Sequence, residues 1–392
     1  MRPVVVTGSL RYRCVRVSGG IELPVVIPHH RRPIVTRSFA AVSLVLFFIG
    51  CGGERQSAGD TANAQLASSG VDLTGAGATF PYPIYSKWFS DYARQTGVRI
   101  NYQSIGSGGG IRQLSEGTVD FGASDSPMTD EEMARARGGP VLHVPTVIGA
   151  VVVTYNVPGV PDSLRLTGEV IAEMFLGRIT RWNDARIAAL NPGVSLPASD
   201  ILIVHRSDGS GTTYVFTDYL AAVSGAWRGG PGRGKEVRWP TGIGAKGNEG
   251  VAGQVKQTPG AVGYVELAYA RQNRLAVAAV RNQADRFVTP AIESITAAAE
   301  SAVGSLGPET DYRVSIVNAP GENAYPISSF TWILLYRDPS DAAKAAKLSD
   351  FLRWALRDGQ QSAPALHYAP LPDALVRQLE ARLDALGAKT AA

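Results

Sequence analysis

The sequence is poor in cysteine and histidine, and each shortage excludes a class of site. The 392 residues include two cysteines and five histidines. So few cysteines exclude a disulfide framework and a multi-cysteine metal site. His143, His205 and His367 are scattered, without i,i+4 pairing or a carboxylate at metal-ligand spacing. We therefore expect no metal site and no cofactor.

Charge is also scarce, and its distribution gives no support for binding to nucleic acid. Charged residues make up 18% of the chain, and the formal net charge is +4. The first 50 residues contain seven arginines and one glutamate, so they contribute +6 and the remainder carries −2. The chain after residue 50 therefore lacks the excess of positive charge that is typical of proteins that bind nucleic acid or an anionic membrane. An apolar content of 45% is ordinary for a globular protein, and the length allows two domains with full cores.

The apolar run near the N-terminus is too short to cross a bilayer. It spans eleven residues, 39–49, and follows an arginine-rich stretch at 31–37, as in an export signal. A glycine and Cys51 come next and resemble a lipoprotein cleavage box, although Phe48 stands where leucine is usual. We predict cleavage before Cys51 and its lipidation, with residues 52–70 as a flexible tether. Cleavage elsewhere, with Cys51 incidental, is the alternative.

From Val71 onward, strand and helix patterns alternate. Residues 84–92 repeat apolar side chains at helical spacing, whereas 98–102 alternate like a strand. Residues 147–153 form a continuous β-branched run, which indicates a strand buried on both faces. Alternating strands and helices predict parallel sheets, with ligands at the carboxyl ends of the strands.

Residues 206–212, which read Arg-Ser-Asp-Gly-Ser-Gly-Thr, are the most informative segment. They lie between a strand pattern and a helical one, so unpaired N–H groups and a positive helix end predict an anion site. Asp208 is unexpected there because it places a negative charge two residues from Arg206. We interpret Asp208 as a group that orients the guanidinium and offsets part of its charge; a simple loop cap is the alternative.

Three loops, this one included, occupy the same position between a strand and a helix. They are residues 78–80, 106–108 and 209–212, and residues 124–125 also follow a strand. If they converge, they form a nearly all-donor site for a tetrahedral oxyanion, with Arg206 as its one full positive charge. None has the Walker A pattern or the spacing of a GxSxG nucleophile elbow.

Six segments, in order, make a family resemblance specific: residues 74–81, 105–107, 119–125, 145–149, 208–212 and 259–266. From about Val71 to the C-terminus the chain resembles the phosphate-binding protein of the bacterial phosphate ABC importer, the PstS family. The resemblance implies an α/β, two-lobed periplasmic-binding-protein-like fold of type II. Each lobe has a central, mostly parallel sheet flanked by helices, and two hinge crossovers join the lobes.

The resemblance also implies which residues hold phosphate. The implied ligands are Thr79, Phe80, Ser107, Asp125, Arg206, Ser210, Gly211 and Thr212, with Asp208 supporting Arg206. Gly108 departs from the family, which often has a second serine there, so one hydroxyl is lost. Phosphate keeps a proton near neutral pH, and the Asp125 carboxylate can accept its hydrogen bond. Sulfate has no such proton, so the carboxylate would repel it.

Chain order suggests the domain limits. Residues 1–50 are the leader, of which 1–30 fit no signal peptide and are explained by a true start near Val35 or by a disordered cytoplasmic extension. Residues 51–70 hold the lipidated cysteine and the tether. Residues 71–147 and 323–392 form one lobe, and 148–322 form the other.

The function implied is that of an exported, monomeric binding protein. It would sit in the periplasm or at the cell surface, anchored to the membrane by lipid. There it would deliver inorganic phosphate to the permease and ATPase subunits of an importer. Three alternatives stay open. One is a phosphate sensor, and another is a protein for a different oxyanion such as arsenate. The third is a phosphatase with Ser210 as nucleophile, although no activating base is evident and we predict no enzyme.

Overall fold

The computed structural model describes residues 73–390. Its main element is a nine-stranded mixed sheet. The strand order is β2-β1-β3-β12-β4-β8-β6-β7 with β9 beside β4, and a smaller sheet has the order β11-β10-β5. The strands are β1 Leu73–Gly77, β2 Ile100–Ser104, β3 Phe121–Ser124, β4 Val141–Tyr155, β5 Arg165–Leu166, β6 Leu202–Arg206, β7 Ile243–Ala245, β8 Ala261–Glu266, β9 Ala276–Val277, β10 Ala279–Arg281, β11 Phe287–Val288 and β12 Ser328–Tyr336. The predicted leader, Cys51 and the tether to residue 70 lie outside the described residues.

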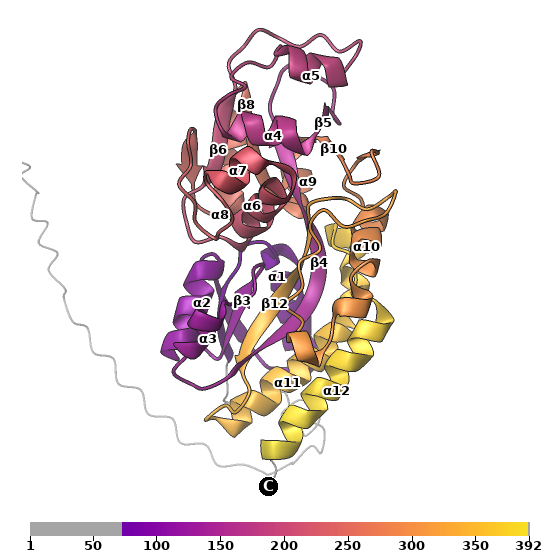
Figure 1. Cartoon of the computed structure of the whole chain (residues 1–392). Helices are drawn as coiled ribbons and strands as arrows, with labels where there is room; N and C mark the ends of the chain where they lie inside the picture. The colour runs from indigo at the N-terminus through magenta and orange to yellow at the C-terminus, as the bar shows by residue number, and fades with distance from the viewer. Residues whose placement is uncertain (1–72, 391–392) are drawn as a thin grey trace, which may run out of the picture. The chain divides into compact units, whose positions relative to one another are not determined.

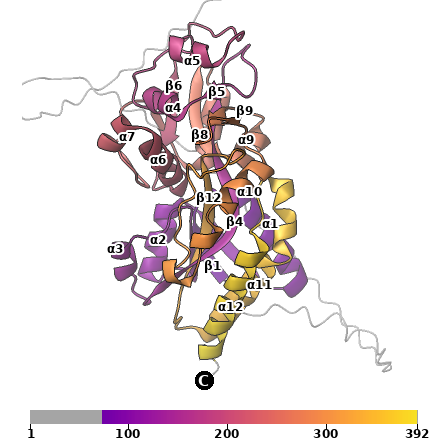
Figure 2. The same cartoon turned by 45° about the vertical axis from the view of Figure 1, so that its right-hand side comes forward.

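Helices follow most of the strands. They are α1 Tyr82–Thr96, α2 Ser107–Glu116, α3 Asp130–Ala134, α4 Gly168–Phe175, α5 Ala185–Leu190, α6 Gly211–Val223, α7 Gly225–Gly229, α8 Gly247–Gln257, α9 Leu267–Asn273, α10 Ile292–Glu300, α11 Ala342–Leu356 and α12 Asp373–Thr390. In both views α11 and α12 lie side by side (Figures 1 and 2).

The long strand β4 joins the two halves of the large sheet. It pairs with β12 from Val141 to Ala150 and with β8 from Val151 to Tyr155. Figures 1 and 2 show β4 running beside β12 at one end and beside β8 at the other. We call the half containing β2, β1, β3 and β12 the first lobe and the half containing β8, β6 and β7 the second lobe. The change of partner after Ala150 lies three residues beyond the predicted limit at 147, and the domain limits stay predictions.

Within each lobe the strands are mostly parallel, and the predicted fold class is confirmed. In the first lobe β1 pairs in parallel with both β2 and β3, and in the second lobe β6 pairs in parallel with both β7 and β8. The antiparallel partners are β12 and β4. Strands that run in the same direction bring their carboxyl ends to one edge, which is where loops can form a site.

β4 is longer than the β-branched run that predicts it. Its additional residues include Pro145, which is unusual in a strand interior because proline has no N–H. The pairing with β12 shifts its register there, since Thr331 faces Val147 while Trp332 faces Pro145. Thr146 is therefore the extra residue of a β-bulge, which accommodates the proline.

Local chemistry explains the ends of the helices nearest the site. α1 begins after Pro81, has Pro83 in its first turn and ends at Thr96, and it is capped by Gly97, whose φ of 77° favours glycine. α3 begins with a capping box between Thr129 and Glu132. α11 begins at Ala342, and its Ala- and Lys-rich first turns favour helix without apolar periodicity.

Candidate functional site

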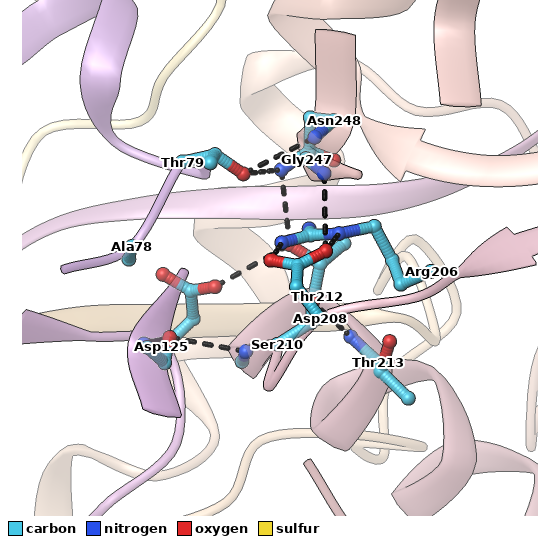
Figure 3. A network of polar contacts seen from close by, with 12 residues as sticks. Ala78, Thr79, Asp125, Arg206, Asp208, Ser210, Thr212, Thr213, Gly247 and Asn248 are labelled. Carbon is cyan, nitrogen blue, oxygen red and sulfur yellow. Dashed lines mark hydrogen bonds and ion pairs between the residues drawn. The ribbon is translucent and has the colours of Figure 1, made fainter. Parts of the chain in front are cut away.

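The carboxyl ends of five parallel strands lead into the loops of the candidate site. In the first lobe, β1, β2 and β3 precede Thr79, Ser107 and Asp125, and in the second lobe β6 and β7 precede Ser210 and Asn248. Ser107 is the first residue of α2, and Ser210 is the N-cap of α6, so both helices direct their positive ends and free N–H groups to this region. Figure 3 shows Thr79 and Asp125 of the first lobe facing Ser210 and Asn248 of the second.

The predicted ligands lie together in this region. The set comprises Thr79, Phe80, Ser107, Asp125, Arg206, Ser210, Gly211 and Thr212, with Asp208 beside Arg206. All eight of the ligand residues are buried.

Arg206 and Asp208 form a paired, two-point contact. Arg206 Nε donates to Asp208 Oδ1 at 2.8 Å, and Nη2 donates to Oδ2 at 2.6 Å. Burial alone would raise the pKa of Asp208. The hydrogen bonds and the charge of Arg206, with the Gly247 N–H, outweigh that effect and hold the pKa below its usual value. Asp208 is thus a carboxylate that fixes the guanidinium in one orientation, and it leaves further N–H donors of Arg206 for an anion.

The hydroxyl groups at the site are arranged as donors. Thr79 Oγ1 accepts from Asn248 Nδ2 at 2.7 Å and from the Asn248 N–H at 3.2 Å. Ser107 Oγ accepts from the Gly211 N–H at 3.0 Å and from the Asp125 N–H at 3.3 Å. Ser210 Oγ accepts from the N–H at Thr213 at 3.0 Å. Because each oxygen is already an acceptor, each hydroxyl proton is left to be donated to another group.

Asp125 is the acceptor among these donors. Its side chain receives the Thr331 hydroxyl on Oδ1 at 3.2 Å and the Thr212 hydroxyl on Oδ2 at 3.4 Å. Burial raises the pKa of Asp125 to about 7, although the positive charge of Arg206 opposes the shift. A carboxyl group that titrates near neutral pH can either accept a proton from an anion or donate one to it.

Contacts across the site join the two lobes. The Gly108 N–H donates to the Gly209 carbonyl at 2.9 Å, and Lys235 Nζ contacts both oxygens of Glu132 at 2.6 and 2.7 Å. A Cβ at position 108 would lie 3.1 Å from Gly209 Cα, which is a tight approach. Gly108, which replaces the second serine of the family pattern, therefore suits the close packing of these two backbones.

Three residues that contact the predicted ligands are not predicted from the sequence. Asn248 Nδ2 joins Thr79 to the Thr212 hydroxyl, the latter at 3.1 Å, and the Gly247 N–H donates to Asp208 Oδ1 at 3.0 Å. Both residues follow β7 and open α8, so the strand-loop-helix rule that located the other loops could have found them. Thr331 lies inside the apolar strand β12 and has no local signal of this kind.

Two of the scattered histidines have other contacts. His143 is buried, with Nε2 accepting from the Met128 N–H at 3.0 Å and Nδ1 2.7 Å from Asp311 Oδ2. The His205 ring stacks on Trp239 at a centroid distance of 4.8 Å.

Within residues 73–390, no helix is both long enough and apolar enough to span a bilayer.

Comparisons with known proteins identify the family. Residues 56–358 match the PBP superfamily domain. The Phosphate-binding protein PstS of Xylella fastidiosa (strain Temecula1) is 49% identical over 79% of this chain and 84% of that protein. The same-named protein of Pasteurella multocida is 46% identical over 81% of this chain and 91% of its own length.

A solved structure supports the fold. It is that of PfluDING, described as a high affinity periplasmic phosphate-binding protein bound with phosphate. It has a TM-score of 0.65 at 23% identity and covers 79% of this chain and 93% of its own. Together with the two-lobed fold and the predicted segments, these relatives establish that the chain belongs to the PstS family of phosphate-binding proteins, within the PBP superfamily.

Proposed function

We propose that this protein captures inorganic phosphate outside the cytoplasm and delivers it to the permease and ATPase subunits of a phosphate ABC importer. The observation that supports phosphate best is the distribution of donors and acceptors. Hydroxyls of Thr79, Ser107 and Ser210 have protons to donate, and Asp125 is a buried acceptor that titrates near neutral pH. A protonated tetrahedral anion satisfies both kinds of group.

The proposed ligands are those that the family resemblance implies. They are the Thr79 hydroxyl and N–H, the Phe80 N–H, Ser107, Asp125, Arg206, Ser210 and the N–H groups of Gly211 and Thr212. The names of the PstS relatives support a phosphate ligand. We also propose that the protein acts as a monomer held at the membrane by lipid on Cys51, in the periplasm or at the cell surface.

Isothermal titration of the purified protein with phosphate and with sulfate tests this function. We expect phosphate to bind and sulfate to bind at least roughly a hundredfold more weakly, because a buried unmatched polar group costs about 1–3 kcal/mol and the charge on Asp125 adds to it. Equal affinities would refute the discriminating role of Asp125, and absence of phosphate binding would refute the function.

A binding role without turnover is part of the proposal. Ser210 Oγ caps α6 by accepting the Thr213 N–H, and the ring nitrogens of His143 already contact Met128 and Asp311. These contacts support Ser210 as a donor to a ligand, and they leave no ring nitrogen of His143 free to act as its base. Hydrolysis of a chromogenic phosphate ester that Ser210→Ala abolishes would favour an enzyme instead.

Replacing Gly211 by alanine is expected to weaken phosphate binding by roughly five- to a hundredfold, since overpacking typically costs about 1–3 kcal/mol. The new Cβ would lie 2.5 Å from both Asp125 Oδ2 and Ser107 Oγ and 2.7 Å from the Asp125 backbone nitrogen. Gly253→Ala in α8 is the matched control, because its Cβ would meet nothing within 4 Å. Titration calorimetry should detect the loss in the first variant alone, and equal affinities would contradict the assigned position of Gly211.

A further inference from the structure

Three consecutive carbonyl groups beside the site are each bonded to a buried or partly buried tyrosine hydroxyl. Tyr102 donates to Ala78 O at 2.8 Å, Tyr269 donates to Thr79 O at 2.7 Å, and Tyr368 donates to Phe80 O at 2.7 Å. The tyrosines come from three distant parts of the chain: the strand β2, the helix α9 and the segment between α11 and α12. We call them the tyrosine clamp.

The clamp determines where two N–H groups point. In a trans peptide the carbonyl and the following N–H point in opposite directions, and residues 73–390 contain no cis peptide. The bond from Tyr102 to Ala78 O therefore orients the Thr79 N–H. In the same way, the bond from Tyr269 to Thr79 O orients the Phe80 N–H.

Both N–H groups remain available to a ligand. Neither Thr79 nor Phe80 uses its N–H in a hydrogen bond to another residue in the range 73–390. The carbonyl that Tyr368 holds precedes Pro81, which has no N–H, so this third bond fixes the direction in which the chain enters α1. The clamp thus restrains the whole loop from the side opposite its free donors.

We propose that Tyr102, Tyr269 and Tyr368 are positioning residues for the anion, which hold these carbonyls so that the Thr79 and Phe80 N–H groups point into the site. The inference rests on the proposed phosphate-binding function. Its physical basis is preorganisation: donors that are already oriented lose little entropy when the anion binds.

The tyrosines are suited to this task because they stay protonated. Burial raises the pKa of all three hydroxyls well above the usual range for tyrosine, so each remains a donor wherever the protein is folded. A bound water could make the same contact, but it would be less restrained than a ring packed in the core.

Glu266 contacts the clamp through the Tyr368 hydroxyl. Tyr368 has one hydroxyl proton, which the Phe80 carbonyl must receive because a carbonyl cannot donate. The Tyr368 hydroxyl also donates a longer contact of 3.1 Å to Glu266 Oε2, and Glu266 accepts the Ala268 N–H on that same oxygen at 2.8 Å. Its other oxygen, Oε1, is buried without a partner among the described residues, and burial raises the pKa of Glu266 well above its usual value. A neutral Glu266 adds no negative charge near the anion.

Tyr269 also links loop orientation to the closing of the lobes. It belongs to α9, which follows β8 in the second lobe, whereas Thr79 follows β1 in the first. Tyr102 and its acceptor both belong to the first lobe. The Thr79 carbonyl accepts the Tyr82 N–H at 3.2 Å within the first lobe, and the bond from Tyr269 adds a second restraint on it, and so on the Phe80 N–H, when the lobes are together. The Thr79 N–H is held within one lobe.

Phenylalanine substitutions test the clamp because they remove one hydroxyl and keep the ring. We expect Tyr102→Phe and Tyr269→Phe each to weaken phosphate binding by roughly three- to tenfold, the usual effect of one hydrogen bond. Tyr155→Phe is the matched control. The Tyr155 hydroxyl donates to the Pro161 carbonyl over a distance of 2.6 Å, and this contact does not involve the site. Affinity like that of the unsubstituted protein in both clamp variants would overturn the inference.

A second measurement separates the clamp from the function itself. Nuclear magnetic resonance relaxation of the Thr79 and Phe80 amides, recorded without phosphate, should show greater motion in Tyr102→Phe and Tyr269→Phe but not in Tyr155→Phe. If the unsubstituted protein fails to bind phosphate while these amides still move more in the two clamp variants, the proposed function fails and the clamp stands. If phosphate binds but amide motion is the same in the clamp variants and the unsubstituted protein, the clamp fails and the function stands.

Discussion

Replacing Arg206 by alanine is expected to weaken phosphate binding by roughly a hundredfold to several thousandfold, because hydrogen bonds to charged groups contribute about 1.5–3 kcal/mol each. The guanidinium has five N–H donors, and three are directed at Asp208 and Thr212. The remaining two N–H groups can donate charge-assisted hydrogen bonds to the anion. Titration calorimetry with phosphate measures the loss.

The same substitution leaves Asp208 without its cation, and stability should fall by about 3–5 kcal/mol as for other broken buried pairs. The Asp208 side chain is 12% exposed and would keep the Gly247 N–H at 3.0 Å. Adding Asp208→Asn to Arg206→Ala removes the unpaired charge. This double variant should regain stability against urea but not affinity, and recovered affinity would argue against a direct contact between Arg206 and phosphate.

The sequence predicts the loops of the site well because each follows a local rule. A strand that ends in a small or glycine-rich loop and opens a helix can be recognised within about ten residues, as for Ser107 and Ser210. The role of Asp125 follows no such local rule. It is inferred from chemistry, because a carboxylate among hydrogen-bond donors can accept the proton that phosphate carries. The resemblance to a family then brings these separate loops into one site.

The groups that support the ligands escape prediction because their partners are distant in sequence. Tyr269 and Thr79 are 190 residues apart, and Tyr368 and Phe80 are 288 residues apart. Thr331 reaches Asp125 through the pairing of antiparallel β12 with β3, beside the bulge in β4. Register and bulge position depend on the assembled sheet, so no local pattern in β12 predicts that contact.

Replacing Asp125 by asparagine is expected to reduce the preference for phosphate over sulfate by roughly a hundred- to a thousandfold. Asparagine has the same shape, and its oxygen can still accept the proton of phosphate. Its amide can instead donate to a sulfate oxygen, and the repelling charge is gone. Competition titrations with both anions measure the ratio. Asp338→Asn, at an exposed carboxylate, removes the same charge away from the site and should leave the ratio unchanged. A preserved preference in Asp125→Asn would show that another group excludes sulfate.

The pH dependence of stability gives an independent test of the Asp125 carboxyl. Its pKa of about 7 in the folded protein lies above the value near 3.9 expected for an unfolded chain. The folded state therefore binds more protons than the unfolded state between these values. The contribution of Asp125 to stability is fully present below about pH 4 and is lost as the pH rises through 7. In urea unfolding without phosphate, the unsubstituted protein should lose stability relative to Asp125→Asn across this window. Parallel curves would mean that Asp125 is ionised throughout, and the shared proton would then have to come from phosphate alone.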